Sequence, residues 1–304
     1  MNVSRTTPPR PLAVTAVFPQ LAPLARPATR LHPRPGAPSP HESSVGGPLL
    51  WPADEPWPYC AQRHQWHEAP GDEWHEGPNA MVPVAQLYVR DVPLLRPPGQ
   101  SDLLQVLWCP FEHPPEYKPP TALFWRSAAE VTQVLAAPPE PSAVEYDGYV
   151  PEPCVLAPEQ ITEYPHPMEL SEELRQQLGD WSRWQAAGAG VDSSYASYPE
   201  EFYDTELSLA PGWKVGGWPP WGLTDPAARF CAVCDAGMVP LLTIASNEWD
   251  AGNGGWVPYE DQTLAALDDA RVSNPPKVQV SRGNHLQLYV CPESPDHPHT
   301  DLIQ

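Results

Sequence analysis

The stretch that decides the fold is Met81-Val82-Pro83-Val84-Ala85-Gln86-Leu87, because a close copy of it stands near the end of the chain. That copy reads Met238-Val239-Pro240-Leu241-Leu242-Thr243-Ile244. Both are short runs rich in residues that favour β-structure, and both follow a Met-Val-Pro start. They predict two related strands in one chain.

The similarity extends to both sides of these strands. In order, the shared landmarks are a Gly-Gly pair followed by Trp, a Cys, the Met-Val-Pro strand, a Leu-Gln strand that ends in Cys-Pro, and a His-Pro pair. The flanking landmarks are Gly46-Gly47, Trp51, Cys60, Leu104-Gln105, Cys109-Pro110 and His113-Pro114 in the first copy, and Gly216-Gly217, Trp218, Cys231, Leu286-Gln287, Cys291-Pro292 and His297-Pro298 in the second. Five landmarks in one order predict a tandem duplication.

Strand-like runs dominate both copies. They are bounded by Pro, Gly, Asp or Asn and cover residues 82–89, 103–109, 240–245, 277–281 and 286–291. Two helices are expected: one opened by the capping box Ser127-Ala128-Ala129-Glu130 and running to about Ala136, and one capped by Ser171 and ending before Gly188. The predicted class is α+β, with two related mixed or antiparallel sheets, few helices, and loops that hold most of the 45 prolines.

The organisation expected from these signals has four parts. Residues 1–45 form an arm rich in Pro and Arg, 46–165 the first repeat, 166–210 a helical connection, and 211–304 the second repeat. The arm carries five arginines and one glutamate, whereas the rest of the chain has 12 basic and 37 acidic residues. We therefore expect the arm to dock on the acidic body, with Val17, Phe18, Leu21 and Leu24 supplying apolar contacts; the alternative is a free, solubilising tail.

Charge and hydropathy restrict the class of partner. The formal charge of −21 repels phosphate backbones, so nucleic acid is not expected as a partner. No apolar run approaches the roughly 20 residues of a membrane span, and the start of the chain lacks the form of a signal peptide. We expect a cytoplasmic protein that binds no membrane; its oligomeric state is left open.

Six cysteines in such a protein suggest thiols or metal ligands rather than disulfides. Cys231-Ala232-Val233-Cys234 has the spacing that lets two thiolates bind one tetrahedral metal. Cys291 and His297 complete a candidate structural zinc site of the Cys3His type, with His299 as the alternative fourth ligand. A redox pair and buried thiols without metal are the competing interpretations.

The first copy offers a second, weaker candidate set: Cys60, His64, Cys109 and His113. Cys154 has no partner by the logic of the repeat and is expected to be simply buried. The histidines and acids around His64, His67, Glu68 and His75 are interpreted as a polar surface loop.

The chain resembles the YwqG-like family of uncharacterised bacterial proteins, a domain of unknown function. The Gly-Gly, Met-Val-Pro-Val-Ala-Gln and Leu-Gln-Val motifs carry the resemblance. Residues 51–58, 211–218 and 244–250 are similar to the actinobacterial branch of the family. The resemblance covers the chain from about Gly46 onward and implies a duplicated α+β fold with two related sheets. It implies no catalytic residues, but relatives among toxin–immunity genes raise an immunity-like role in binding another protein.

No assembled enzyme motif is present in the sequence: neither a G-x-S-x-G elbow, nor a phosphate-binding loop, nor H-E-x-x-H. Asn247-Glu248-Trp249-Asp250, directly after a predicted strand, is the best placed for a site, although a structural role is favoured. The tryptophans around Gly216-Gly217 and Trp51 are expected to fill the core. We therefore expect a non-enzymatic binding or scaffold protein with structural zinc and a protein partner. The alternative is a hydrolase with an acidic, aromatic cleft between the repeats.

Overall fold

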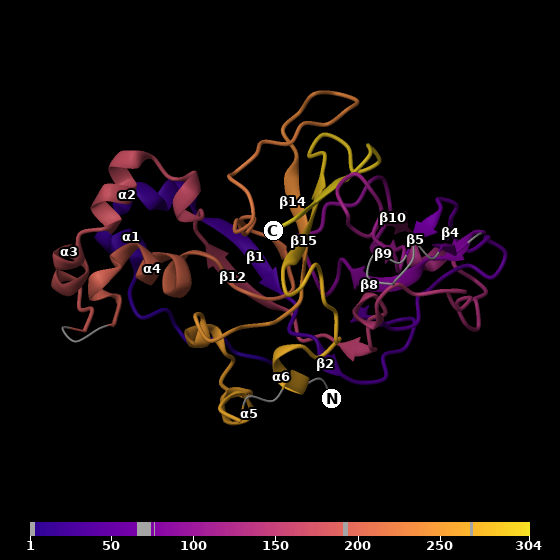
Figure 1. Ribbon diagram of the computed structural model, residues 1–304, viewed down its shortest axis with the longest axis horizontal. Coiled ribbons are helices and arrows are strands. Elements are labelled where there is room, and N and C mark those ends of the chain that lie inside the picture. Colours follow the sequence, from indigo (N-terminus) through magenta and orange to yellow (C-terminus); the bar gives the residue numbers. More distant parts are fainter. Residues whose placement is uncertain (1–3, 66–73, 76, 191–193, 268–269) are drawn as a thin grey trace.

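The computed structural model describes residues 4–65, 74–75, 77–190, 194–267 and 270–304. Its two main elements are six-stranded antiparallel sheets, with a group of short helices beyond one of them (Figure 1). The predicted α+β class with two sheets is confirmed.

The first sheet has the strand order β10-β9-β8-β3-β11-β2, and the second has the order β12-β1-β13-β14-β15-β16. The first consists of β10 (Thr121–Arg126), β9 (Leu103–Trp108), β8 (Val82–Tyr88), β3 (Ser44–Val45), β11 (Cys154–Val155) and β2 (Arg34–Pro35). The second consists of β12 (Glu159–Glu163), β1 (Arg26–Arg30), β13 (Lys214–Gly216), β14 (Val239–Ala245), β15 (His285–Val290) and β16 (Thr300–Ile303). Two small ribbons pair β4 (Tyr59–Cys60) with β7 (Asn79–Ala80), and β5 (His64–Gln65) with β6 (Trp74–His75).

The duplication is visible in the strand registers. Strands β8 and β9 hold the same places in the first sheet as β14 and β15 hold in the second. Each pair also has its one irregularity at the same point of the repeat, between Pro83 and Ala85 and between Pro240 and Leu242. The predicted match of these strand pairs is confirmed. The strand expected over residues 277–281 is wrong, because only the isolated bridge between Val280 and Asn284 forms there.

In chain order the strands form two equivalent sets of six: β1, β2, β3, β8, β9 and β10, and then β11, β12, β13, β14, β15 and β16. Counted by these sets, the second copy begins with β11, inside the segment 46–165 that was expected to be the first repeat. Each copy gives its first strand to the sheet of the other, because β1 lies in the second sheet between β12 and β13, and β11 lies in the first sheet between β2 and β3. The two copies are therefore interlocked by an exchange of equivalent strands.

This exchange places sheet strands inside the segment expected to be an arm. β1, β2 and β3 all fall within residues 1–45, so the expected boundary at residue 45 does not coincide with a boundary of the sheets. Of the apolar residues expected to dock, Phe18 and Leu21 are fully buried, and Val17 and Leu24 are partly buried. They pack with Leu174 and other residues from the 166–210 segment in a small helical core.

The predicted helix after Ser171 forms, and the Ser171 side chain accepts a hydrogen bond from the Leu174 N–H. It is split in two, because Asp180 caps a new helix after Gly179. The helix expected from Ser127 to about Ala136 is wrong: only a 3-10 turn, Ala128–Glu130, is present. The Leu135 N–H instead donates to the Trp51 carbonyl, and Val134 forms an isolated bridge with Pro52. The α-helices are α1 (Val14–Val17), α2 (Glu172–Leu178), α3 (Trp181–Ala186), α4 (Pro199–Tyr203), α5 (Gln262–Ala265) and α6 (Ala270–Ser273).

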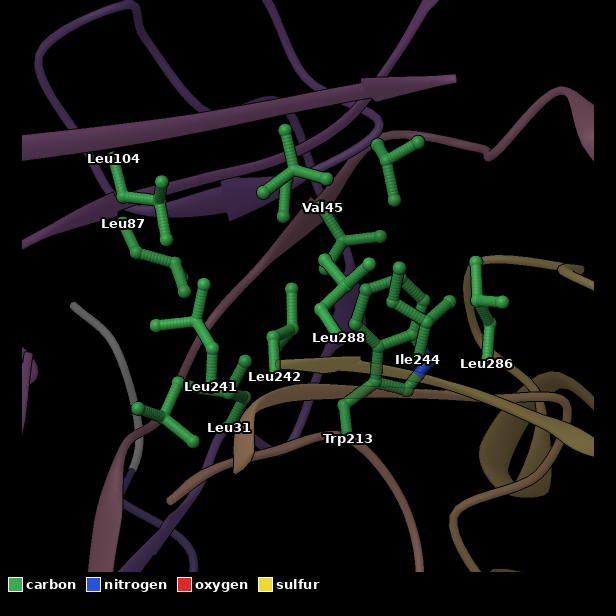
Figure 2. Packing of buried hydrophobic residues seen from close by; sticks show 14 of the residues in the cluster. Leu31, Val45, Leu87, Leu104, Trp213, Leu241, Leu242, Ile244, Leu286 and Leu288 are labelled. Atoms are coloured by element: carbon green, nitrogen blue, oxygen red, sulfur yellow. The ribbon is translucent and has the colours of Figure 1, made fainter. Parts of the chain in front are cut away.

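The main core lies between the two sheets. Figure 2 shows Leu87 and Leu104 of the first sheet on one side, with Leu241, Leu242 and Leu288 of the second sheet opposite. Side chains alternate along β9, so that Leu104 and Val106 face this core while Gln105 and Leu107 face the loops of their own copy. Burial of one face of each sheet against the other holds the two copies together.

Candidate metal centres

Two groups of four Cys and His residues come together, one in each copy. Within each group, the candidate ligand atoms all lie within 4.8 Å of one another. One group is Cys231, Cys234, Cys291 and His297, and the other is Cys60, His64, Cys109 and His113. These are the two sets of candidate ligands named from the sequence.

A tight hairpin presents the first two thiols of the second-copy group. The Cys231 N–H donates to the Ala236 carbonyl, and the Asp235 N–H returns to the Cys231 carbonyl. Asp235 adopts a φ of 59°, a left-handed conformation that Asp tolerates better than most residues. The turn places both sulfurs beside Cys291, which directly follows β15, because β14, which follows the hairpin, pairs with β15.

Distances within this group suit one tetrahedral metal. The Cys234 and Cys291 sulfurs lie 3.4 Å apart, and the Cys231 sulfur lies 3.3 Å from His297 Nδ1. Zn–S bonds of about 2.3 Å at tetrahedral angles place two sulfurs roughly 3.8 Å apart. His299 is not part of the group, because its Nε2 lies 2.8 Å from Thr121 Oγ1.

The first-copy group is built by the equivalent segments. Cys60 lies in β4, whose pairing with β7 corresponds to the hairpin around Cys231. Cys109 follows β9 as Cys291 follows β15, and His113 occupies the place of His297. His64, four residues after Cys60, is the candidate ligand that corresponds to Cys234. Three of the four positions therefore match between the copies, and the longer insert changes the fourth.

Burial distinguishes the two groups. All four members of the first-copy group are buried, whereas Cys234 is exposed and His297 half-buried in the second. His113 Nε2 lies 3.4 Å from the Cys109 sulfur and 3.7 Å from the Cys60 sulfur. Both ring nitrogens of His64 are buried without a hydrogen-bond partner of ordinary geometry among the described residues. A buried imidazole in that state is costly unless something binds it, and a metal ion supplies such a partner.

Electrostatics favour a thiolate at Cys60 in one group and at Cys231 in the other, while the neighbouring thiolates raise the pKa of Cys109 and Cys234. A hydrogen bond from the Cys109 thiol stabilises a thiolate at Cys60, and His113 adds a smaller effect of the same sign. Together they lower the pKa of Cys60 despite its burial. Desolvation raises the pKa of Cys231, but the N–H groups of Val233 and Cys234 outweigh it and lower that pKa to about 6. Because the thiolate is the form that binds metal, both groups are prepared to bind a cation.

The other described residues singled out in the sequence lie outside the two Cys and His groups. Trp51, Trp57, Trp213 and Trp221 are buried, in agreement with their expected core role, whereas Trp218 is half-buried beneath the Arg26 guanidinium. Cys154 is fully buried in β11, away from both groups. His75 Nε2 lies 2.9 Å from Ser142 Oγ, while His67 and Glu68 lie outside the described residues.

The sequence did not indicate the buried charges around His32. His32 Nε2 lies 3.0 Å from Glu159 Oε2, and Nδ1 lies 3.8 Å from Glu248 Oε2, so the ring stands between two carboxylates. Arg30 is fully buried beside them, and its Nε and Nη2 have no hydrogen-bond partner among the described residues. Of this set, only Glu248 was singled out by its place after a strand.

Thr7 from the start of the chain closes this charged group. The Thr7 N–H and hydroxyl both donate to Glu159, and Arg30 Nη1 donates to Thr7 Oγ1 over 2.7 Å. No signal within the sequence connects residues this far apart.

Comparison of the chain with models of known protein families and with curated proteins found no match. The resemblance to the YwqG-like family therefore remains an expectation from the motifs. Among the described residues, no helix is long and apolar enough to cross a bilayer.

Proposed function

We propose that this chain is a non-enzymatic binding scaffold in which each copy is stabilised by one structural zinc ion and which holds a protein partner. The observation that carries the proposal is that each copy brings four Cys and His side chains together, three of them at equivalent places. Unrelated buried thiols would not be expected to recur with histidines at matched positions.

Zinc is the metal that this donor chemistry favours. Thiolate and imidazole ligands in groups of four, with tetrahedral spacing, are typical of structural zinc. Four protein ligands leave no open position for substrate, which separates these centres from catalytic zinc sites. In the second copy the metal would connect the hairpin before β14 to the end of β15, and in the first copy it would connect the segment before β8 to the end of β9.

A redox pair is less well supported. Cys234 and Cys291 are close, but each has a histidine and a further thiol within the same 4.8 Å set, as metal ligands do. The equivalent first-copy group has two cysteines and two histidines, so the feature common to both copies is the number of ligands rather than a dithiol.

Metal analysis of the protein purified without added metal tests the proposal. We expect elemental mass spectrometry to find two zinc ions per chain. We also expect a strong chelator to lower the melting temperature, because the free energy of zinc binding contributes to the stability of the folded state. A protein that contains no zinc, takes up none, and melts at the same temperature with and without chelator would refute it.

A second candidate function is hydrolysis at the His32 group. Convergent ionisable groups with shifted pKa values are common in enzyme sites. Burial lowers the pKa of His32 to about 4, and burial likewise raises the pKa of Glu248. In this candidate, displacement of residues 4–10 would open the group to a substrate.

A chain that lacks residues 1–10 tests this alternative against the full chain on ester, amide and glycoside substrates. Activity that appears on truncation and is lost in His32→Asn would support it. Absence of activity from both chains would leave the scaffold as the proposed function.

A further inference from the structure

The edges of the two sheets differ in how they are protected against pairing with another strand. β2 has only two residues, one of them a proline, and Thr7 lies against Glu159 of β12. β16 carries Asp301, whose carbonyl and carboxylate receive Lys118 Nζ at 3.3 and 2.5 Å. Short strands, proline and inward charges are the usual means of blocking a sheet edge.

β10 has none of these protections from Leu123 onward among the described residues; at its first residue, Thr121 Oγ1 donates to Asp301 and lies 2.8 Å from His299 Nε2. It is six residues long, contains no proline, and has Arg126 as its one charged residue. All six residues are partly exposed. Its side chains Leu123, Phe124 and Trp125 belong to types that favour β-structure or apolar contact.

The backbone of β10 presents unpaired outward groups at Leu123 and Trp125. The Cys109 N–H donates to the Pro120 carbonyl, and Thr121 is opposite Trp108 in the register. Because antiparallel pairing alternates, residues 122, 124 and 126 bond to β9, while 121, 123 and 125 point their N–H and C=O groups outward. Within the described chain, no hydrogen bond reaches the outward backbone groups of Leu123 or Trp125.

Two hollows lie along this strand. One, of about 600 Å³, is lined by Trp125 and Arg126 together with Asp54, Glu55 and Glu130. The other, of about 340 Å³, lies between residues 123–125 and the 295–299 segment that contains His297. Trp125 lines both, so the hollows adjoin at one side chain.

Acidic groups border this edge. Asp54 and Glu130 stand at one hollow and Asp296 at the other. Among the described residues that line these two hollows, Arg126 is the one lysine or arginine, and Glu55 binds it through both carboxylate oxygens. An approaching strand therefore meets unpaired backbone groups between carboxylates.

We propose that β10 binds an extended, basic segment of a partner protein by strand addition, with lysine or arginine side chains directed at Asp54, Glu130 and Asp296. This assigns the partner surface of the proposed scaffold and rests on that function. Main-chain hydrogen bonds supply affinity in this mode of recognition, and the flanking pockets supply specificity. A second molecule of this protein is a poorer occupant, because each molecule carries a formal charge of −21 and has the same acidic residues around β10.

The metal centre of the second copy supports this surface. His297 is a candidate metal ligand and also lines the hollow opposite Leu123. Metal binding at Cys231, Cys234, Cys291 and His297 would hold that wall in place, so chelation should weaken partner binding as well as stability.

Labelled eight-residue peptides serve as probes of the edge: alternating lysine and threonine, alternating glutamate and threonine, and the lysine peptide with N-methyl groups on every second backbone nitrogen. The lysine peptide should bind, and both other peptides should bind at least about tenfold more weakly, since one reverses the charge and the other removes the ladder donors. Equal binding of the N-methylated peptide would overturn strand addition.

A matched pair of variants tests the edge itself. Leu123→Pro removes an outward N–H without removing a bond to β9, whereas Leu123→Thr loses the same side-chain packing and keeps the N–H. We expect the proline variant to lose at least about tenfold in affinity for the lysine peptide and the threonine variant to stay within about threefold. Two exposed carboxylates supply a second test that leaves the backbone intact, and the double variant Glu130→Lys, Asp296→Lys should also lose about tenfold.

Zinc content and circular dichroism of each variant separate this proposal from the proposed function. Variants that keep zinc and fold but bind the lysine peptide as the wild type does would overturn the β10 site and leave the zinc scaffold standing. Light scattering decides the occupant: a dimer that Leu123→Pro dissociates would show that a second copy, not a partner, pairs with β10.

Discussion

Ala28 and Gly216 lie opposite each other in neighbouring strands of the second sheet, although one stands near the start of the chain and the other in the second copy. Their pairing places β1 inside a sheet built otherwise from the second half of the chain. The reciprocal pairing of Cys154 with Val45 places β11 inside the first sheet. Neither sheet is complete without a strand from the other copy.

Two fragments, 1–139 and 140–304, should therefore fail to fold separately and should fold when mixed. Each fragment alone would lack an interior strand and expose the face that forms the core between the sheets. Circular dichroism and size-exclusion chromatography of the separate and mixed fragments measure this. A fragment that shows a cooperative melting transition by itself would contradict the interlocked assembly.

Replacing one candidate ligand in either group should remove one of two zinc ions. Cys231→Ser and Cys60→Ser should each bring the zinc content from two to about one per chain, because a tetrahedral site loses most of its affinity with one ligand. Cys154→Ala is the control, since Cys154 is buried in β11 outside both groups and its loss should leave both ions bound. Full zinc content in either serine variant would exclude that cysteine as a ligand.

Gly217→Ala should lower the free energy of unfolding by about 2 to 4 kcal/mol. Gly217 has a φ of 68°, and a Cβ there would lie 2.1 Å from a carboxylate oxygen of Glu163, which accepts the Trp218 N–H and binds Lys214 inside the sheet. Gly222→Ala is matched to it, because a Cβ at Gly222 would meet no atom within 4 Å. Urea denaturation of both variants gives the comparison, and equal stabilities would contradict this account of the Gly-Gly motif.

Phe18→Ala should cost about 3 to 5 kcal/mol of stability, as for other large aromatic truncations in a core. Phe18 is fully buried, and its ring meets that of Trp184 edge to face at 4.8 Å between centroids. Gln20→Ala changes an exposed side chain in the same segment and should cost less than about 0.5 kcal/mol. If thermal melting does not separate the two variants, the start of the chain does not stabilise the protein as inferred.

Stability should fall as the pH drops from 6.5 toward 4, in part through His32. Burial lowers the pKa of His32 from 6.5 to about 4, so between these values the unfolded chain binds a proton that the folded chain does not. Stability therefore rises with pH across this window. The total change in the free energy of unfolding from one such group is about 3 kcal/mol. His32→Asn should flatten the pH dependence of the unfolding free energy between pH 6.5 and 4.5 relative to the wild type. An unchanged slope would show that His32 is not the neutral, buried group described here.

The sequence by itself determined the duplication, the strand content and the two candidate ligand sets. All of these depend on local patterns: β-rich runs, a helix cap at Ser171, and cysteines and histidines at matched places in an ordered set of landmarks. A hairpin such as the one that carries Cys231 and Cys234 is a local structure, and the paired strands β14 and β15 bring it to Cys291. The order of landmarks was therefore sufficient to name residues that meet in space.

Only the tertiary structure decided which strands pair. The run at 26–30 has no local feature that assigns it to the second sheet, because the partner of a strand is chosen by non-local hydrogen bonds and by burial of a shared face. For the same reason, a contact with Trp51 prevents the helix that the capping box at Ser127 predicts. The charged residues around His32 also come together without any local pattern that predicts it. The open edge of β10 likewise exists only because no strand of the described residues lies beside it, a property of the assembled sheet rather than of residues 121–126 themselves.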